Sequence, residues 1–396
     1  MERSWTAGVR GQPPAVRVLL VNQFGVNTGF YLLVPYLAVH MTGDLGLSAA
    51  LTGVVLGARN LSQQGLFLIG GSAADRLGAR NVIIAGCGLR AAGFGLFAFG
   101  DTLPVLLGAA VLSGVAGALF NPAVRAYIAV EAPDRAEAFA LFNVFAQAGA
   151  LCGPLLGALL LAVDFRAAAV AAAAVFAVLT VVQALVLPAR AAAPAATTVL
   201  GDWRACLADR RFLAFTLALS GMFALQNQLY LVLPLAAREA TGTAGSTALL
   251  FLVGTVTTLL LQVRLTRYFA RSASRYRSIA LGLAVMGTGF LAPALLPGLP
   301  AVLAAVVCLE LGVMIAQPFV YELIGVFGGE RRSGTYFGMF YLVSGVVAAV
   351  STALIGWAGA GGAVLCAAIG LACAAATALL GGGAPAPRAS LEPKEG

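Results

Sequence analysis

Charged side chains are scarce in this chain: they make up 10% of its 396 residues, whereas 60% of the residues are hydrophobic. A soluble domain of this size carries roughly 25% charged residues. So few charges cannot cover the surface of a water-soluble globule, which excludes an ordinary soluble enzyme and a disordered chain. The apolar residues must therefore face lipid. Since one membrane span needs about 20 apolar residues, the chain has room for about a dozen spans.

Residues for metal binding and nucleophilic catalysis are also few. The one histidine, His40, excludes a histidine-based metal site or catalytic triad. The six cysteines are scattered without a CxxC pair, and five lie in apolar stretches, where cysteine acts as a small hydrophobic residue. No GxxxxGK[ST] phosphate loop is present. We therefore expect no cofactor, no metal, no ATP-driven step and no enzymatic activity.

Apolar segments recur at near-regular spacing and predict twelve membrane-spanning helices. The first six are expected at about 18–40, 48–74, 82–100, 103–126, 137–163 and 166–187. The second six are expected at about 212–238, 246–263, 278–297, 299–326, 335–358 and 362–380. The predicted domains are a cytoplasmic N-terminal segment 1–17, a six-helix half 18–187, a cytoplasmic linker 188–211, a six-helix half 212–380 and a disordered cytoplasmic tail 381–396.

Basic residues gather on one side of the predicted spans. Counted by alternate loops, 20 of the 24 lie on the side of the two termini, with Arg125 assigned to the loop between spans 4 and 5. The other side has only Arg166 and Arg238, and two more, Arg59 and Arg90, lie inside spans. Because positive loops stay in the cytoplasm, both termini are predicted to be cytoplasmic. The net charge of +8 thus reports membrane topology, and we expect no nucleic-acid partner.

The two predicted halves repeat each other. Three short sequences recur at an offset of 196 to 199 residues: Tyr31–Pro35 at Tyr230–Pro234, Asn121–Pro122 at Gln317–Pro318, and Asp134–Arg135 at Glu330–Arg331. Two six-span halves in parallel repeat are the layout of a large class of transporters. In that layout, the substrate site lies between the halves near the middle of the membrane.

Five segments carry a resemblance to a known family. Residues 71–80 (GSAADRLGAR) resemble the GxxxDRxGxR loop signature of the major facilitator superfamily. Residues 149–157 (GALCGPLLG) resemble the GxxxGPxxG motif of its drug:proton antiporters, and residues 59–66, 90–94 and 164–166 are similar to MdtH-type multidrug exporters. The resemblance implies an all-α fold of twelve transmembrane helices in two six-helix halves, a bacterial inner membrane and a monomer. It also implies drug efflux, and hence a part in antibiotic resistance.

The two motifs also have plain physical roles. Gly71 and Gly78 permit a tight turn, and Asp75 and Arg76 can pair or cap a neighbouring helix end. The resemblance implies that Asp75 docks on the cytoplasmic end of span 11 and separates from it as the halves rock. The alternative is a turn and cap without a gating role. The residues expected to gate are Gly71, Asp75, Arg76, Gly78, Arg80 and Glu322.

Glycines 149, 153 and 157 share one face of span 5 and allow close helix approach. Pro154 frees a backbone carbonyl and bends the helix. The resemblance implies that the bend prevents leakage, whereas packing and kinking alone are the alternative. Two positions depart from the family pattern. Asn22 stands where many of the antiporters carry an acid in span 1, and Ala110 stands where span 4 often has an arginine.

Ionisable side chains inside spans are costly and indicate function. Glu310 lies near the middle of span 10, and we predict that it carries the proton or contacts a cationic substrate. The alternative is a carboxyl group locked to a neighbour such as Arg59, or kept protonated. Glu322 lies close to the cytoplasmic end of the same span, where the arginine-rich loop between spans 8 and 9 should supply its partner. Arg90 is expected to be structural.

Polar residues on otherwise apolar, phenylalanine-rich helix faces are the candidates for substrate contact, because such pockets hold few, well-placed polar groups. Hydrogen bonds between helices are the alternative. The candidates are Asn27, Tyr31, Arg59, Gln63, Asn143, Gln147, Gln226, Tyr230, Gln317 and Tyr321. We predict proton-driven export of small amphipathic or lipophilic compounds. The alternatives are proton-coupled uptake or symport of a metabolite on the same fold, and a polytopic receptor or scaffold that moves no solute.

Overall fold

The structure is a computed structural model that describes residues 5–47, 49–161, 163–188, 198–230, 232–242, 246–272, 274–358 and 361–382. The helices up to residue 186 are α1 (Trp5–Arg10), α2 (Pro14–Val39), the π-helix η1 (His40–Asp44), α3 (Ala49–Gly65), α4 (Phe67–Leu77), α5 (Ala79–Phe99), α6 (Leu103–Glu131), α7 (Arg135–Leu161) and α8 (Phe165–Val186). The later helices are α9 (Val199–Ala208), α10 (Arg210–Gln226), the 3-10 helix η2 (Asn227–Tyr230), α11 (Val232–Thr241), α12 (Ser246–Ser272), α13 (Arg275–Gly289), α14 (Leu291–Leu295), α15 (Leu299–Trp357) and α16 (Gly362–Gly382).

Eleven helical segments among the described residues are long and apolar enough to cross a membrane. The twelfth predicted span is the pair α3 and α4, in which the helix is interrupted at Leu66 and neither piece is long enough alone. Spans 10 and 11 follow each other within α15, which is broken by non-helical backbone at Gly329 and Arg332. The protein therefore has the expected all-α fold of twelve spans.

Two other predicted spans are interrupted near a proline. Proline has no backbone N–H, so the carbonyl oxygen four residues earlier receives no helical hydrogen bond. Span 7 consists of α10, η2 and α11, with Pro234 four residues after Tyr230, where η2 ends. Span 9 consists of α13 and α14, with Pro293 four residues after Gly289, where α13 ends. The sequence predicted both as single helices, because apolar periodicity does not reveal where a backbone carbonyl loses its donor.

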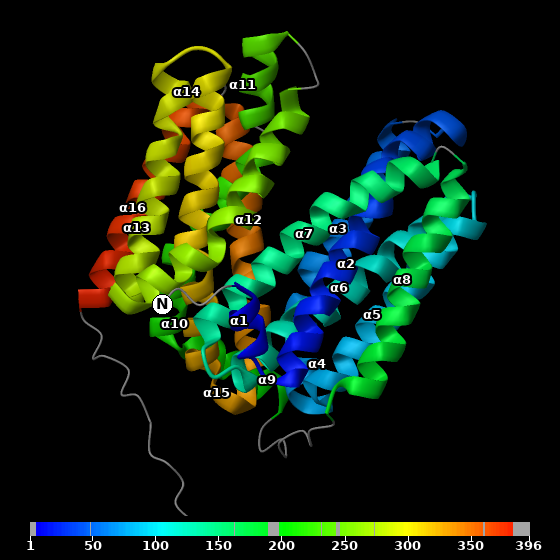
Figure 1. Cartoon of the computed structure of the whole chain (residues 1–396), viewed down its shortest axis with the longest axis horizontal. Helices are drawn as coiled ribbons and strands as arrows, with labels where there is room; N and C mark the ends of the chain where they lie inside the picture. Colours follow the sequence, from blue (N-terminus) through cyan, green and yellow to red (C-terminus); the bar gives the residue numbers. More distant parts are fainter. Residues whose placement is uncertain are drawn as a thin grey trace, which may run out of the picture.

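The helices form two groups, α2–α8 and α10–α16, as Figure 1 shows. The groups meet at the end of the molecule that holds α9, which we call the linker end, and diverge toward the opposite, open end (Figure 1). Within the first group α2 packs on α7 and α5 packs on α6 and α8, while in the second group α13 packs on α15 and α16. The groups contact each other mainly through α4 with α15 and α7 with α12.

Small residues make the closest of these contacts. On α4, a Cβ atom at Gly71 would overlap the carbonyl oxygen of Gly334 on α15, and one at Gly334 would overlap the carbonyl of Gly71. On α7, Gly149, Gly153 and Gly157 lie against the backbone of α2 in the same way. The backbones approach because these positions lack side chains, as is typical of helix contacts in membranes. The predicted close approach along span 5 is therefore confirmed.

Candidate substrate pocket and linker-end contact

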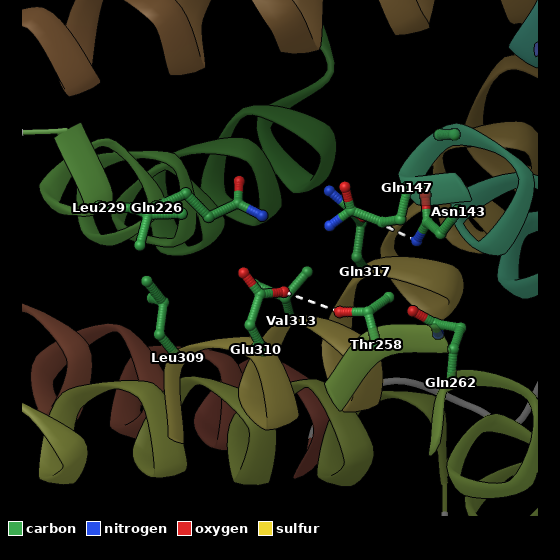
Figure 2. A pocket seen from close by; sticks show the side chains of 11 residues that line it. Asn143, Gln147, Gln226, Leu229, Thr258, Gln262, Leu309, Glu310, Val313 and Gln317 are labelled. Atoms are coloured by element: carbon green, nitrogen blue, oxygen red, sulfur yellow. Dashed lines mark hydrogen bonds between the residues drawn. The ribbon is translucent and has the colours of Figure 1, made fainter. Parts of the chain in front are cut away.

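A cavity of about 230 Å³ lies between the two halves. It is smaller than the 300–1,000 Å³ typical of ligand pockets, so it fits a small ligand or part of a larger one. One helix of the first half, α7, and three helical segments of the second half, around α10, α12 and α15, form its wall (Figure 2). The lining residues are Asn143, Ala146, Gln147, Gln226, Leu229, Thr258, Gln262, Leu309, Glu310, Val313 and Gln317.

Carboxamide groups dominate the polar part of this lining. Five of the eleven lining residues are Asn or Gln, one is Thr258, one is the acid Glu310, and none is basic. Carboxamides donate and accept hydrogen bonds without carrying charge. The pocket can therefore hold neutral polar groups by hydrogen bonds and a single positive charge at Glu310, with apolar contacts from its leucine and valine side chains.

Glu310 is buried, with 8% of its surface exposed. Its Oε2 accepts a hydrogen bond from Oγ1 of Thr258 on α12, at 3.0 Å (Figure 2). Gly254, one turn earlier on α12, leaves the space that the carboxyl group occupies, since a Cβ there would lie 3.1 Å from Oε1. No arginine or lysine among the described residues forms an ion pair with Glu310. The alternative in which Glu310 is locked to Arg59 is therefore wrong.

A hydrogen bond between the halves closes one side of the pocket. Nδ2 of Asn143 on α7 donates to Oε1 of Gln317 on α15, at 2.8 Å (Figure 2). Gln317 lies seven residues, or two helical turns, after Glu310 on the same helix. The pocket thus combines residues that are 174 positions apart in the chain.

The structure brings four of the ten predicted substrate-contact residues into this pocket: Asn143, Gln147, Gln226 and Gln317. Asn27 instead joins α2 to α7, because its Nδ2 donates to the carbonyl of Ala146 at 2.8 Å. Tyr31 stacks edge-on against Phe30. Tyr321 is buried among aromatic rings. The side chain of Tyr230 lies outside the described residues.

Arg59 and Gln63 form a network inside the first half rather than part of the pocket lining. Nη2 of Arg59 donates to Oε1 of Gln63 at 3.2 Å, and Nη1 donates to Oδ1 of Asn60 at 2.9 Å. The guanidinium carbons of Arg59 and Arg90 lie 4.6 and 5.8 Å from the ring centre of Phe30. Cation–aromatic contacts of this kind stabilise buried guanidinium groups by roughly 2 kcal/mol each when they are desolvated.

Asn22, the residue that replaces an acid in span 1, is buried at 2% exposure. Its Oδ1 accepts a hydrogen bond from Nε2 of Gln183 on α8, which also reaches Sγ of Cys87 on α5. Asn22 therefore ties span 1 to the rest of the first half, away from the pocket lining. The acid of the pocket is on α15, in the second half.

Sequence reasoning missed the two other polar residues of the pocket lining, Thr258 and Gln262 on α12. They are four positions apart and therefore share one face of an otherwise apolar helix. The same spacing of four separates two pairs of predicted substrate-contact residues, Gln226 and Tyr230, and Asn143 and Gln147. It was available from the sequence of span 8.

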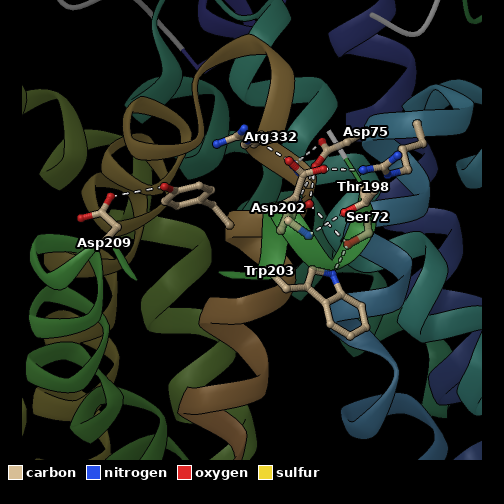
Figure 3. Close-up of polar contacts among 12 residues, drawn as sticks. Ser72, Asp75, Thr198, Asp202, Trp203, Asp209 and Arg332 are labelled. Atoms are coloured by element: carbon tan, nitrogen blue, oxygen red, sulfur yellow. Dashed lines mark hydrogen bonds and ion pairs between the residues drawn. The ribbon is translucent and has the colours of Figure 1, made fainter. Parts of the chain in front are cut away.

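The contact of the halves at the linker end centres on Asp75 (Figure 3). Its Oδ1 accepts from the backbone N–H of Gly334 at 2.8 Å, and its Oδ2 accepts from N–H and Oγ1 of Thr335, both at 2.7 Å. Asp75 therefore docks on the start of span 11, as the family resemblance implied. Burial raises the pKa of Asp75 from 3.8 to about 6, and the hydrogen bonds from Thr335 and Gly334 partly oppose this rise.

The linker helix α9 strengthens this contact, and the sequence did not predict it. Its Asp202 pairs with Arg76 of the first half at 2.6 Å and with Arg332 of the second half at 3.0 Å (Figure 3). Nε1 of the neighbouring Trp203 donates to Oγ of Ser72 at 2.7 Å. The signal that could have revealed α9 is Thr198 before an apolar stretch, since its hydroxyl caps the helix.

The other predicted gating residues have local partners. Gly78 has φ of 84°, which confirms its part in the tight turn between α4 and α5, whereas Gly71 lies inside α4 and its predicted part in a turn is wrong. Arg80 caps the end of α8 by donating to the carbonyls of Leu187 and Ala184. Nε of Arg275 donates to Oε2 of Glu322 at 3.0 Å, so the partner expected from the loop between spans 8 and 9 is confirmed. Both helices of this pair belong to the second half, and a gating role for Glu322 stays a prediction.

A second acid–base pair joins the halves at the linker end. Nε of Arg267, near the end of α12, donates to Oε1 of Glu137 in the first turn of α7, at 2.8 Å. With the contact of Asp75 on α15, each half thus presents a charged group to the start of a helix in the other half. The halves are joined by ion pairs and hydrogen bonds at the linker end.

Comparison with known proteins agrees with this architecture. A family model described as Major Facilitator Superfamily matches residues 19–352. The chain belongs to the major facilitator superfamily. It is 43% identical over 361 residues to an uncharacterized MFS-type transporter of Mycobacterium tuberculosis strain H37Rv, covering 88% of this chain and 86% of that protein. It is 32% identical over 322 residues to the multidrug resistance protein MdtH of Aeromonas hydrophila, covering 81% of each chain.

Solved structures of the superfamily share the fold at low sequence identity. The fucose:proton transporter FucP in its outward conformation matches with a TM-score of 0.77 and 15% identity, over 92% of this chain and 98% of that one. The human organic anion transporter MFSD10 matches with a TM-score of 0.73 and 16% identity, over 93% and 99%. As a member of this superfamily, the chain is a multi-pass membrane transporter.

Proposed function

We propose that this superfamily member exports small amphipathic or lipophilic compounds in exchange for protons, by alternating access. The observation that carries the proposal is the pocket between the halves, in which Glu310 is the one acid among eleven lining residues and forms no ion pair with a basic residue among those described. A buried carboxyl group of this kind can bind a proton or a cationic substrate in turn. The MdtH relatives at about 31% identity support export as the direction.

The charge distribution supports an assignment of the two ends. Because most of the arginines lie in loops on the side of the termini and the linker, we assign the linker end to the cytoplasm and both termini with it. The contact of the halves at that end then corresponds to a state that faces outward. We propose that the protein lies in the inner membrane of a bacterium and acts as a monomer without enzymatic activity. Export would then make the cell resistant to the exported compounds.

Transport by proteoliposomes tests this proposal. With a pH gradient across the membrane, the wild-type protein should accumulate a lipophilic monocationic dye against its gradient, and Glu310→Gln should abolish gradient-driven transport because it cannot exchange a proton. The matched control is Glu239→Gln, which removes an exposed acid of α11 outside the pocket lining. Unchanged gradient-driven transport by Glu310→Gln would refute the role of Glu310.

Uptake with protons is the alternative function, and the absence of an acid in span 1 is the observation that favours it. Asn22 occupies that position and is bonded to Gln183. The same proteoliposomes separate the two functions, since a symporter moves substrate down the proton gradient and an exporter moves it in the opposite direction. A chain that moves no solute under either gradient would be a receptor or scaffold.

A further inference from the structure

Arg125 was assigned from the sequence to the cytoplasmic loop between spans 4 and 5. In the structure Arg125 lies inside α6, six residues before that helix ends at Glu131. Its Nη1 donates to the carbonyl oxygen of Asn121 at 3.0 Å and to Oδ1 of the same residue at 3.4 Å. The assignment to a loop is therefore wrong: position 125 lies within the predicted span 103–126, and α6 continues past it to Glu131.

Three aromatic rings surround the guanidinium group of Arg125. Its Cζ lies 5.2 Å from the ring centres of Phe142 and Tyr321 and 5.1 Å from that of Tyr341. Both tyrosines are buried, with 2% and 8% of their surface exposed. No acidic residue among those described forms an ion pair with Arg125. We call these three rings the aromatic cage.

The cage joins the two halves of the molecule. Arg125 and Phe142 belong to α6 and α7 of the first half, whereas Tyr321 and Tyr341 lie on α15 of the second half, before and after its break at Gly329. The two tyrosine rings also contact each other, with centres 6.3 Å apart. A movement that separates the halves at the linker end must therefore pull the tyrosines away from the cation.

The aromatic cage lies next to the pocket, on the side of the linker end. Tyr321 follows the pocket residue Gln317 by four positions, one helical turn or about 6 Å closer to the linker end. Phe142 is the neighbour of Asn143, which donates to Gln317 across the pocket. The guanidinium group of Arg125 therefore lies between the pocket and the linker end.

The internal repeat gives independent support. Asn121–Pro122 and Gln317–Pro318 are equivalent positions of the two halves, 196 residues apart, and the same offset takes Arg125 to Tyr321. Equivalent residues of two halves related by a pseudo-two-fold axis meet where their helices face each other at that axis. Arg125 and the ring of Tyr321, which are in contact, therefore lie near that axis.

We propose that Arg125 and the aromatic cage form the inner gate of the pocket. In the state described here, the guanidinium group and the rings of the aromatic cage block access sterically, because they come from both halves. The fixed positive charge of Arg125 adds an electrostatic barrier, since such a charge in a narrow passage excludes cations. When the linker end opens, Arg125 stays with Asn121 and Phe142 in the first half, while Tyr321 and Tyr341 move away with the second half. The proposal rests on the proposed alternating access, but the leak that it predicts needs no substrate.

Proton leak across proteoliposomes tests the gate. An internal pH-sensitive dye reports the decay of an imposed pH gradient with no substrate present. Arg125→Gln should speed that decay at least tenfold over the wild type, because the charge barrier is lost, and Arg125→Lys should keep most of the barrier. Tyr321→Phe, which keeps the ring, should behave as wild type, and Tyr321→Ala should leak.

The matched control is Arg264→Gln, which removes an exposed positive charge of α12 near the linker end and should leave the leak unchanged. Thermal unfolding in detergent identifies variants that fail to fold. If Arg125→Gln fails to fold, the comparison of leak rates between Tyr321→Ala and Tyr321→Phe tests the gate. A leak equal to wild type in folded Arg125→Gln and in Tyr321→Ala would overturn the gate. If the wild type moves no dye yet Arg125→Gln leaks, the proposed function fails while the gate stands.

Discussion

Single side chains decide how the acid of the pocket is held. Glu310 accepts one hydrogen bond from another described side chain, the hydroxyl of Thr258, and its other oxygen faces the space left by Gly254. A hydrogen bond to an ionised group contributes about 1.5–3 kcal/mol. The hydroxyl therefore positions the carboxyl group and favours its charged form, while the glycine provides the room.

Replacing that hydroxyl should impair transport. Thr258→Val keeps the size of the side chain and removes the bond to Glu310, so we expect the gradient-driven transport rate to fall about tenfold, the equivalent of about 1.4 kcal/mol. The neighbouring residue supplies the control. Thr257 donates to the carbonyl of Val253 on its own helix, and Thr257→Val should transport at the wild-type rate. Equal rates for both variants would contradict the role of Thr258.

At the scale of the helix, the glycine face of α7 determines how spans 1 and 5 pack. A Cβ atom at Gly153 would lie 2.7 Å from Cβ of Tyr31 and 2.8 Å from the carbonyl oxygen of Thr28, closer than real side-chain contacts allow. The close separation of α2 and α7 therefore depends on a missing side chain at that position.

We predict that Gly153→Ala lowers the free energy of unfolding by about 1–3 kcal/mol, because α2 must move away from α7. Gly95→Ala on α5 is the control, since a Cβ there meets nothing within 4 Å. It should leave stability unchanged or raise it by about 0.5–1 kcal/mol, as alanine favours the helix. Thermal unfolding in the same detergent measures both, and equal unfolding temperatures would show that the contact adjusts without cost.

At the scale of the whole molecule, polar contacts join the two halves at the linker end, around α9, Asp75 and Arg267, and the Asn143–Gln317 hydrogen bond joins them at the pocket. These contacts are reversible, because each uses a charged group that water can solvate after separation. Asp202 is central to them, since it pairs with Arg76 in one half and with Arg332 in the other. The structure thus permits the rocking that alternating access needs.

The closed contact should weaken as pH rises. Buried Asp75 has a pKa of about 6 in the closed form, whereas a solvated aspartate has an ordinary pKa of 3.8. Asp75 therefore binds a proton more tightly in the closed form than when it is solvated. This proton-linked stabilisation is complete below about pH 4 and is lost as pH rises through 6. Between pH 5 and 7 the open fraction should therefore increase, with Arg76, Asp202 and Arg332 as the charged groups around Asp75.

Distances between spin labels on exposed residues of the two halves, Leu77→Cys and Val326→Cys in a variant without its native cysteines, measure that open fraction. Asp75→Asn should remove the pH dependence. Asp101→Asn, which changes an exposed acid outside the contact, should retain it. A distance distribution that stays constant between pH 5 and 7 in the wild type would contradict this prediction.

The sequence by itself determined the membrane architecture. Scarce charge, twelve apolar segments and an internal repeat sufficed for the number of spans and the two halves, because each is a property of local composition and spacing. The motif around Asp75 also indicated its contact with span 11, and the sequence singled out Glu310 because an acid in a span is costly.

The tertiary structure decided which polar residues meet. Asn27 and Arg59 share the helix-face pattern of Asn143 and Gln317, yet the first two bind neighbours within one half and the last two line the pocket. Helical spacing tells which residues share a face, but the partner of that face depends on how the helices pack. For the same reason Arg125 became a gate residue only when α15 brought two tyrosines from the other half to it.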